Sequence, residues 1–202
     1  MKPSKKICWA MGLSAALLSG AALAKPFSYT YVEGGYADVE DDGNNGAENL
    51  YLNGSLALNP QQSILLRGSV GTLDYDNDLE FDTASIGVGH PMSISPRTDV
   101  LFALDYGFAE SESRNPALDD IDVDTLTLSA TSRTWLTNNI EGNLTAGVAH
   151  QEIDSDDDTG AELGAGIRLY VIPQFSVAAN ISRSFVGDLD RDVLGVSARL
   201  QF

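Results

Sequence analysis

The residues that could carry chemistry are mainly acidic, and some gather in short runs. Two Asp-x-Asp-x-Asp runs stand out, formed by Asp74, Asp76 and Asp78 and by Asp154, Asp156 and Asp158. This spacing begins a calcium-binding loop, in which carboxylates at alternate positions surround the ion. Neither run continues as an EF-hand, because glycine is absent from the sixth position and the twelfth is Ser85 or Ala165. We therefore expect solvated acids and no dedicated metal site, with weak, shared binding of Ca²⁺ or Mg²⁺ as the alternative.

A second candidate for chemistry is His150, which lies two residues before Glu152. A histidine beside a carboxylate can act as a general base. No serine stands two residues away, and the other histidine, His90, is expected at the opposite end of the fold. We therefore predict no catalytic residue and no cofactor.

The first 24 residues are typical of a secretory signal peptide. Three lysines precede a mostly apolar run over 7–18, and Ala22 and Ala24 form a small-x-small cleavage site. Cleavage would leave 25–202 as one domain and remove Cys8, the only cysteine. The remaining chain would have a net charge of about −20, which excludes a nucleic-acid partner because phosphate binding needs a basic face.

The rest of the chain alternates between apolar and polar residues in segments of about ten residues. Alternate side chains of a strand point to opposite faces, so each segment has one apolar face. The last segment shows this from Leu194 to Phe202, where every second residue is apolar. We predict ten strands, with eight as the fallback, near 27–37, 49–58, 63–73, 81–90, 98–110, 122–134, 140–152, 160–171, 174–186 and 191–202.

The connections between these strands divide the acids unevenly. Connections two, four, six and eight are short and contain no Asp or Glu, whereas the other five, with the adjoining strand ends, hold 24 of the 29 acids. In an up-and-down barrel, every second connection lies at the same end, and outer-membrane barrels have short periplasmic turns and longer external loops. A β-sandwich gives no reason for charge to gather at one end. We therefore predict a closed, antiparallel transmembrane β-barrel.

The opening Y-T-Y-V-E-G-G-Y over Tyr29–Tyr36 and the terminal aromatic Phe202 carry a resemblance. Together with the ten alternating segments, they resemble the small proteobacterial outer-membrane β-barrel proteins, catalogued as porin-like or OmpA/OmpX-like barrels. The resemblance implies a location in the outer membrane of a Gram-negative cell. It also implies that the barrel-assembly machinery reads Phe202 as its signal.

Charged residues recur on the predicted inward face of the strands. Four acids and four arginines would share one narrow interior, and would be tolerated there as a hydrogen-bonded network: Glu33, Arg67, Asp105, Arg133, Glu141, Glu162, Arg168 and Arg199. Barrels of about this size are nearly filled by their own side chains. The network therefore predicts a filled lumen, and a small selective pore is the alternative.

The leading functional hypothesis is a monomeric outer-membrane protein with a structural or surface-interaction role and acidic external loops. A narrow porin-like channel for small solutes is one alternative, and a lipid A-modifying or proteolytic barrel enzyme using His150 is another. The expected partners are outer-membrane lipid and lipopolysaccharide, with divalent cations as a further option. Arg183 is expected near the outer headgroups, where it would extend to water or pair with a lipopolysaccharide phosphate.

Overall fold

Ten β-strands make up the fold in the computed structural model, which describes residues 27–41, 46–75, 79–113, 121–153, 156–186 and 190–202. The predicted signal peptide and part of the acidic connections lie outside these residues. In the described part of the chain, no helix is long and apolar enough to cross a membrane. The strands are β1 (Tyr31–Asp41), β2 (Gly46–Ala57), β3 (Leu65–Tyr75), β4 (Leu79–Ser95), β5 (Thr98–Ser113), β6 (Asp122–Trp135), β7 (Ile140–Ile153), β8 (Asp156–Ile172), β9 (Phe175–Phe185) and β10 (Arg191–Gln201).

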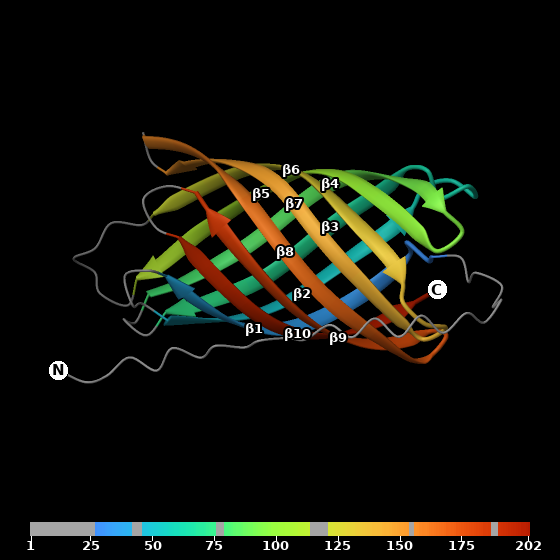
Figure 1. Ribbon diagram of the computed structural model, residues 1–202. Coiled ribbons are helices and arrows are strands. Elements are labelled where there is room, and N and C mark those ends of the chain that lie inside the picture. Colours follow the sequence, from blue (N-terminus) through green and yellow to red (C-terminus); the bar gives the residue numbers. More distant parts are fainter. Residues whose placement is uncertain (1–26, 42–45, 76–78, 114–120, 154–155, 187–189) are drawn as a thin grey trace.

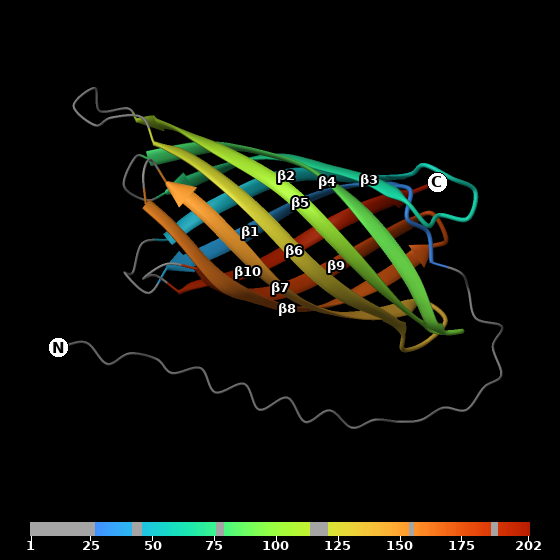
Figure 2. The same ribbon diagram turned by 90° about the horizontal axis from the view of Figure 1, so that it is seen from above.

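The strands form one closed, entirely antiparallel barrel in which each strand pairs with its neighbours in sequence (Figure 1). The strands are tilted relative to the barrel axis, as closure of a sheet requires (Figure 2). β1 closes the sheet against β10, with Tyr31 opposite Gln201 and Tyr36 opposite Val196. The predicted ten-stranded barrel is confirmed, and so is the pairing of its first and last strands.

The two ends of the barrel differ in their connections. We call one the turn end; it has the short connections 58–64, 96–97, 136–139 and 173–174 and the C-terminus. We call the other the acidic end; it has the connections after β1, β3, β5, β7 and β9. Gln62 in the first turn has a φ of 53°, a left-handed conformation that is uncommon outside glycine.

Alternation along the strands separates an apolar outer wall from a polar interior. Leu50 on β2 and Leu144 on β7 are each 65% exposed, and similar aliphatic side chains cover the outside of every strand. The intervening side chains point inward and include most of the buried polar residues. The outer wall therefore presents the large apolar side chains, while the inner wall provides the charges and hydroxyls.

The first strand begins later than its alternation indicates. The expected strand was 27–37, but β1 starts at Tyr31, and residues 27–30 turn into the barrel at the turn end. Phe27 is 7% exposed and Tyr29 is 3% exposed there. An apolar–polar–apolar pattern is compatible with a strand and also with this inserted segment. Alternation alone therefore could not show where the strand begins.

Glycines on the inner wall make room for large neighbours on the adjacent strand. A Cβ at Gly35 would overlap the ring of Tyr51, which lies directly opposite on β2. A Cβ at Gly87 would likewise overlap the carboxylate of Asp105 on β5. The second glycine of the Y-V-E-G-G-Y segment therefore has a packing role inside the lumen.

Candidate functional site

The candidate site is the lumen of the barrel, because the charged residues on the inward phase of the strands meet there. The structure places all eight residues of the expected network on the inner wall: Glu33, Arg67, Asp105, Arg133, Glu141, Glu162, Arg168 and Arg199. Four of them are buried, namely Glu33, Arg133, Glu141 and Arg168, and the other four are partly exposed. The four acids of this network and Asp99 are the five acids that lie away from the acidic end, and all five are lumen residues.

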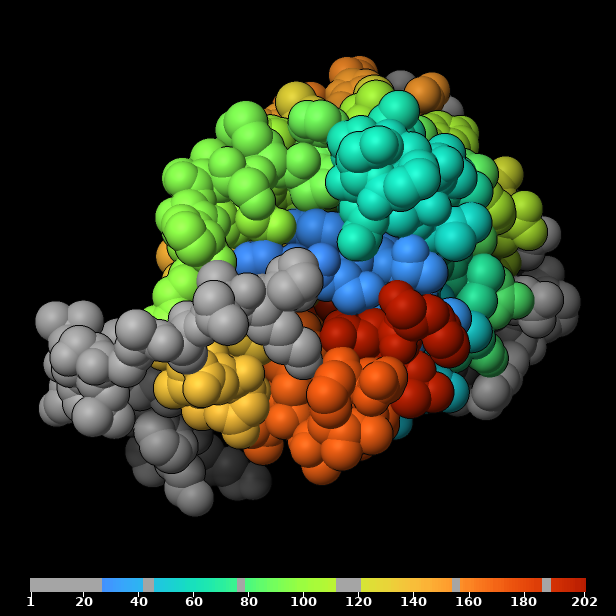
Figure 3. All heavy atoms as spheres, turned by 90° about the vertical axis from the view of Figure 1, so that its right-hand side faces the viewer, coloured from blue at the N-terminus to red at the C-terminus, as the bar shows by residue number. Residues whose placement is uncertain are grey.

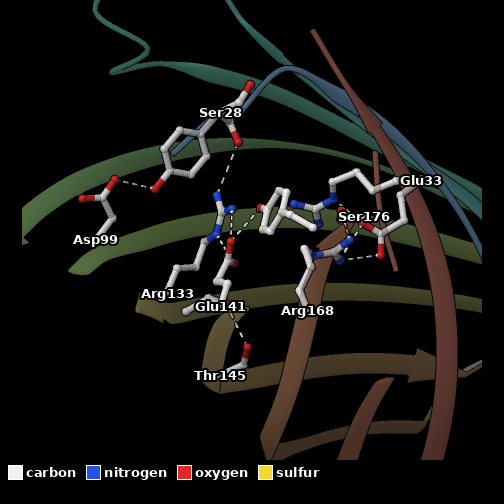
Figure 4. A network of polar contacts seen from close by, with 12 residues as sticks. Ser28, Glu33, Asp99, Arg133, Glu141, Thr145, Arg168 and Ser176 are labelled. Atoms are coloured by element: carbon white, nitrogen blue, oxygen red, sulfur yellow. Dashed lines mark hydrogen bonds and ion pairs between the residues drawn. The ribbon is translucent and has the colours of Figure 1, made fainter. Parts of the chain in front are cut away.

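The ion pair between Arg133 and Glu141 forms one centre of the network near the turn end. The Arg133 Nε donates to Glu141 Oε1 at 2.7 Å and its Nη2 donates to Oε2 at 2.9 Å, which is a bidentate arrangement. Tyr170 donates its hydroxyl to Glu141 Oε2 at 2.8 Å. The two charged side chains are only 6% and 2% exposed. Each buried charge is thus compensated directly, as burial requires (Figure 4).

The inserted segment 27–30 completes this centre. The Arg133 guanidinium lies 4.7 Å from the centroid of the Phe27 ring and 4.9 Å from that of Tyr29. It also donates to the backbone carbonyl of Ser28 at 3.5 Å. The amide N–H of Tyr29 donates to the side chain of Gln62 at 3.0 Å. The segment is therefore attached to the strands by aromatic, cationic and hydrogen-bonding contacts.

The Tyr29 hydroxyl donates to Asp99 Oδ2 at 3.0 Å, and Ser93 donates to Asp99 Oδ1 at 2.6 Å. Burial raises the pKa of the Tyr29 phenol above its ordinary value, and the Asp99 charge raises it further, while Arg133 opposes this shift. The phenol therefore remains protonated at neutral pH and acts as the donor. Asp99 obtains two hydrogen bonds in a buried position and forms no ion pair within the described residues, although Arg133 lies opposite it on β6.

Aromatic side chains seal the space around these charges. Phe27 stacks on Trp135 with ring centroids 5.3 Å apart, and Trp135 contacts Tyr170 at 4.9 Å. These rings form the core cluster of the protein with Tyr29 and Leu65, which is fully buried. Viewed from the turn end, the first described residues lie in the middle of the barrel mouth, with the turns of other strands around them (Figure 3).

A second centre surrounds Glu33 deeper in the barrel. Arg168 donates its Nη2 to both carboxylate oxygens of Glu33, at 3.0 and 2.9 Å, and Arg199 also pairs with this carboxylate. Ser197 donates to Glu33 Oε1 at 2.6 Å, and Arg168 donates to Ser176 at 3.2 Å. Glu33 comes from β1 and Arg168 from β8, so the contact joins strands that are not neighbours in the sheet. We call this centre, the Arg133–Glu141 centre and the aromatic cluster together the plug.

The lumen toward the acidic end is lined differently. The Arg67–Asp105 pair, at 3.0 Å, lies at the boundary, because Arg67 also lines a cavity of about 190 Å³ among the plug charges; its side chains are 28% and 21% exposed. Hydroxyl and amide side chains line a cavity of about 540 Å³ here, and a cavity of about 480 Å³ adjoins it. The hydroxyls form short contacts among themselves, such as Ser69 with Ser85 at 2.7 Å. This half is polar and incompletely filled by side chains.

The metal candidates do not form a cluster in the described part of the chain. Asp76, Asp78 and Asp154 lie outside the described residues, as does the side chain of Asp156. Asp74 and Asp158 are exposed, on different strands. Among the described residues, no group of three or more histidine, cysteine or acidic residues is placed to hold a metal ion.

The two histidines and Arg183 lie on the outer wall. His150 contacts the Thr159 hydroxyl at 2.9 Å, and His90 contacts the Ser63 carbonyl at 2.6 Å. Both rings are in exposed residues, and among the described residues neither forms a hydrogen bond with a carboxylate or a serine hydroxyl. Arg183 pairs with Asp190 at 2.8 Å and with Asp192 at 3.6 Å. Its charge is therefore balanced within the protein, which lowers the need for a lipid phosphate.

The terminal residue Phe202 lies at the turn end, 79% exposed. Its backbone N–H donates to the Thr30 carbonyl at 3.0 Å, and its own carbonyl accepts a bond from Ser28 at 3.2 Å. The C-terminus is thus joined to the segment that enters the plug. Its ring remains free on the outside of the barrel.

Sequence reasoning missed several members of the plug. Phe27 and Tyr170 were assigned only to strands, Trp135 fell just after the expected strand 122–134, and Asp99 was not included in the network. A signal was available for two of them, because Trp135 and Tyr170 are aromatic residues at inward positions close to the short turns, where most inward residues are polar. The bend of residues 27–30 into the barrel has no comparable signal in the sequence.

Comparisons with known proteins support the fold. No family model matches the sequence, and no curated protein matches it. Among solved structures, the β-domain of the Bordetella autotransporter BrkA has a TM-score of 0.57 at 8% identity, covering 87% of this chain and 100% of that one. An outer-membrane channel from Pseudomonas putida F1 has a TM-score of 0.56 at 7% identity, covering 92% and 100%. The translocator domain of the autotransporter NalP from Neisseria meningitidis has a TM-score of 0.52 at 11% identity, covering 89% and 91%.

These similarities define a class of fold. A closed, antiparallel barrel with an apolar outer wall and a polar interior is the architecture of outer-membrane β-barrels. The solved structures that resemble it have the same architecture at identities between 7% and 11%. The chain therefore adopts the outer-membrane β-barrel fold, and its function must be argued from the lumen.

Proposed function

We propose that this protein is a bacterial outer-membrane β-barrel protein with a structural or surface-interaction role, whose lumen is closed at the turn end. The observation that carries the proposal is the plug. The bidentate Arg133–Glu141 pair is buried among Phe27, Tyr29 and Tyr170, and each charge has a partner within 3 Å. A solute passing this point would have to break a desolvated ion pair and displace aromatic rings.

The outer wall supports the membrane part of the proposal. Exposed leucine, isoleucine, valine and phenylalanine side chains surround the barrel; Leu128 and Leu194, for example, are each 61% exposed. A wall of this kind is costly in water and suits hydrocarbon. Short turns are typical of the periplasmic side, so the acidic end would face outward. The predicted signal peptide agrees with export to the outer membrane.

The partners follow from this orientation. The acidic end would face lipopolysaccharide and the external medium, where divalent cations are the natural counterions of carboxylates. Phe202 would remain available to the barrel-assembly machinery, because its ring is exposed on the outer wall. The proposal needs no second copy of the chain and no catalytic step.

A narrow porin-like channel for small solutes is the second candidate. The observation in its favour is the polar lumen toward the acidic end, with cavities of about 540 and 480 Å³. A channel requires this space to continue through the turn end, where the plug stands. The two candidates therefore differ in one property, the continuity of water along the barrel axis.

Conductance in a planar lipid bilayer distinguishes the two functions. We expect the purified protein to show no steady single-channel current, because the plug interrupts the lumen. A triple variant, Phe27→Ala with Arg133→Ala and Glu141→Ala, removes the plug contacts and should show discrete current steps. The matched control, Ser69→Ala with Ser85→Ala, removes a hydrogen-bonded pair that lines the cavity of about 540 Å³ outside the plug and should stay silent. Steady current from the unmodified protein would favour the channel and overturn the closed-lumen proposal.

A further inference from the structure

Every arginine of the lumen has an acidic partner. Arg67 pairs with Asp105, Arg133 with Glu141, Arg191 with Asp41, and both Arg168 and Arg199 pair with Glu33. Asp99, which has no arginine, accepts two hydrogen bonds. Glu162 differs from all of these acids. In the described part of the chain, its carboxylate has neither an ion pair nor a hydrogen bond.

Glu162 lines the cavity of about 480 Å³ toward the acidic end. Its strand neighbours Gly164 and Gly166 are also on the inner wall, so no side chain from β8 fills the space beside it. Two arginines line this cavity: Arg183 pairs with Asp190, and Arg191, which attracts Glu162, is already bonded to Asp41 at 3.0 Å and to the Tyr75 hydroxyl at 3.4 Å. Glu162 therefore shares the charge of Arg191 with Asp41 and borders open space in a narrow lumen, where a further counter-charge is favoured.

The same cavity contains a second acceptor without a donor. The side-chain oxygen of Asn49 on β2 is buried and has no hydrogen-bond partner. Asn143 and Asn180 line the cavity close to β8, because a Cβ at Gly166 would overlap the Asn180 amide. An unsatisfied buried acceptor and a carboxylate without an ion pair or hydrogen bond can both be satisfied by one group, a donor that also carries positive charge.

The chemistry of the lining favours an ammonium group over a metal ion. Ca²⁺ or Mg²⁺ in a protein takes six or more oxygen ligands, including carboxylates. The described residues provide no group of three metal-ligating side chains. A primary ammonium has three N–H donors, and one carboxylate with amide and hydroxyl oxygens can satisfy them. Aliphatic side chains, Val39, Leu73 and Val193, also line the cavity and suit a short hydrocarbon.

We propose that this lumen cavity is a binding site for a small solute that carries a primary ammonium group on a short aliphatic body, with Glu162 as its counter-ion. Asn49 accepts a hydrogen bond from the same solute. The site lies in the half of the lumen away from the plug, so it does not depend on whether the turn end is closed.

Isothermal titration calorimetry of the purified protein in detergent micelles tests the site with propylammonium as the probe. We expect saturable binding. Tetramethylammonium has the charge without N–H donors, and propan-1-ol has a similar chain without the charge. Each should bind about tenfold more weakly or not at all, because a hydrogen bond to a charged group contributes about 1.5–3 kcal/mol.

Two variants locate the binding. Glu162→Gln should weaken propylammonium binding about tenfold or more. Glu152→Gln, the matched control, removes an exposed acid of the outer wall at the acidic end and should bind as the unmodified protein does. A heat-dependent shift in gel mobility shows that each variant is folded. If Glu162→Gln does not fold, Asn49→Ala should also weaken binding.

The inference is overturned by the absence of saturable heat in the unmodified protein. It is also overturned if folded Glu162→Gln binds propylammonium as tightly as the unmodified protein. Equal binding of tetramethylammonium and propylammonium would contradict the role of the N–H donors. These outcomes are independent of the conductance result, so the failure of one proposal does not carry over to the other.

Discussion

The turn end and the acidic end of this barrel use charge in opposite ways. In the plug, the arginines on β6, β8 and β10 are matched by buried carboxylates, with side chains that are mostly under 12% exposed. At the acidic end, acids of neighbouring strands lie directly opposite one another on the outer wall. Glu110 faces both Asp82 and Asp122, and Glu152 faces both Asp124 and Asp157.

The difference shows what each group of charges contributes. A buried charge is tolerated only with a partner, so the plug charges form a hydrogen-bonded unit that specifies one arrangement. Like charges in cross-strand pairs are unfavourable, and exposure to water is what makes them tolerable. The acids at the acidic end therefore cost stability, which is consistent with a role in surface interaction instead of folding.

The largest expected effect on stability comes from replacing a buried carboxylate of the plug by its neutral amide. The same change at an acid outside the plug provides the comparison. Glu141→Gln leaves Arg133 buried without a counter-charge, and should lower the free energy of unfolding by about 3–5 kcal/mol. Asp105→Asn leaves Arg67, whose side chain is 28% exposed, and should cost about 1 kcal/mol or less. Urea unfolding in lipid vesicles, followed by tryptophan fluorescence, measures both.

Equal losses of stability in the two variants would remove the distinction between the plug and the rest of the lumen. If both substitutions cost the same, the Arg133–Glu141 pair would be hydrated in the folded protein. Replacing both partners, Arg133→Met with Glu141→Met, is the control. It should cost less than Glu141→Gln alone, because no buried charge is left unpaired.

The smallest expected effect is of opposite sign and lies at the acidic end. Glu110→Gln removes the repulsion with Asp82 and Asp122, and should raise the free energy of unfolding by about 0.5 kcal/mol at low salt. Added salt should remove the gain, because it screens exposed charges in the unmodified protein as well. Urea unfolding at two ionic strengths provides the measurement. A loss of stability would mean that Glu110 has a favourable partner.

Most of the architecture could be predicted from the sequence, because two independent patterns agree. Alternation defines the inner and outer walls, and the alternate acidic connections define the two ends. Since the side-chain period of a strand is two residues, a correct phase also places the eight charged residues inside. Leu50, Leu52 and Leu56 on β2 are therefore exposed, while Asn49 and Tyr51 line the lumen.

The contacts inside the lumen could not be predicted in the same way. The pairing of Glu33 with Arg168 joins residues 135 positions apart on strands that are not adjacent, and alternation contains no information about such distances. Arg183 was expected to extend to water or to pair with a lipopolysaccharide phosphate, and its ion pairs with Asp190 and Asp192 were not expected. Phe27 was expected in a strand and lies in the plug, because its pattern fits both.

Thiol accessibility at two lumen positions tests the central claim most directly. The only cysteine of the sequence, Cys8, lies in the predicted signal peptide, so single cysteines can be introduced into 25–202 without background. Thr127→Cys places a thiol in the polar half of the lumen, and Ser176→Cys places one beside Arg168 in the plug, where the serine is 1% exposed. A small, charged, water-soluble methanethiosulfonate should modify the first in the folded barrel, and the second only after unfolding by heat. Equal rates of modification at the two positions in the folded protein would contradict the account.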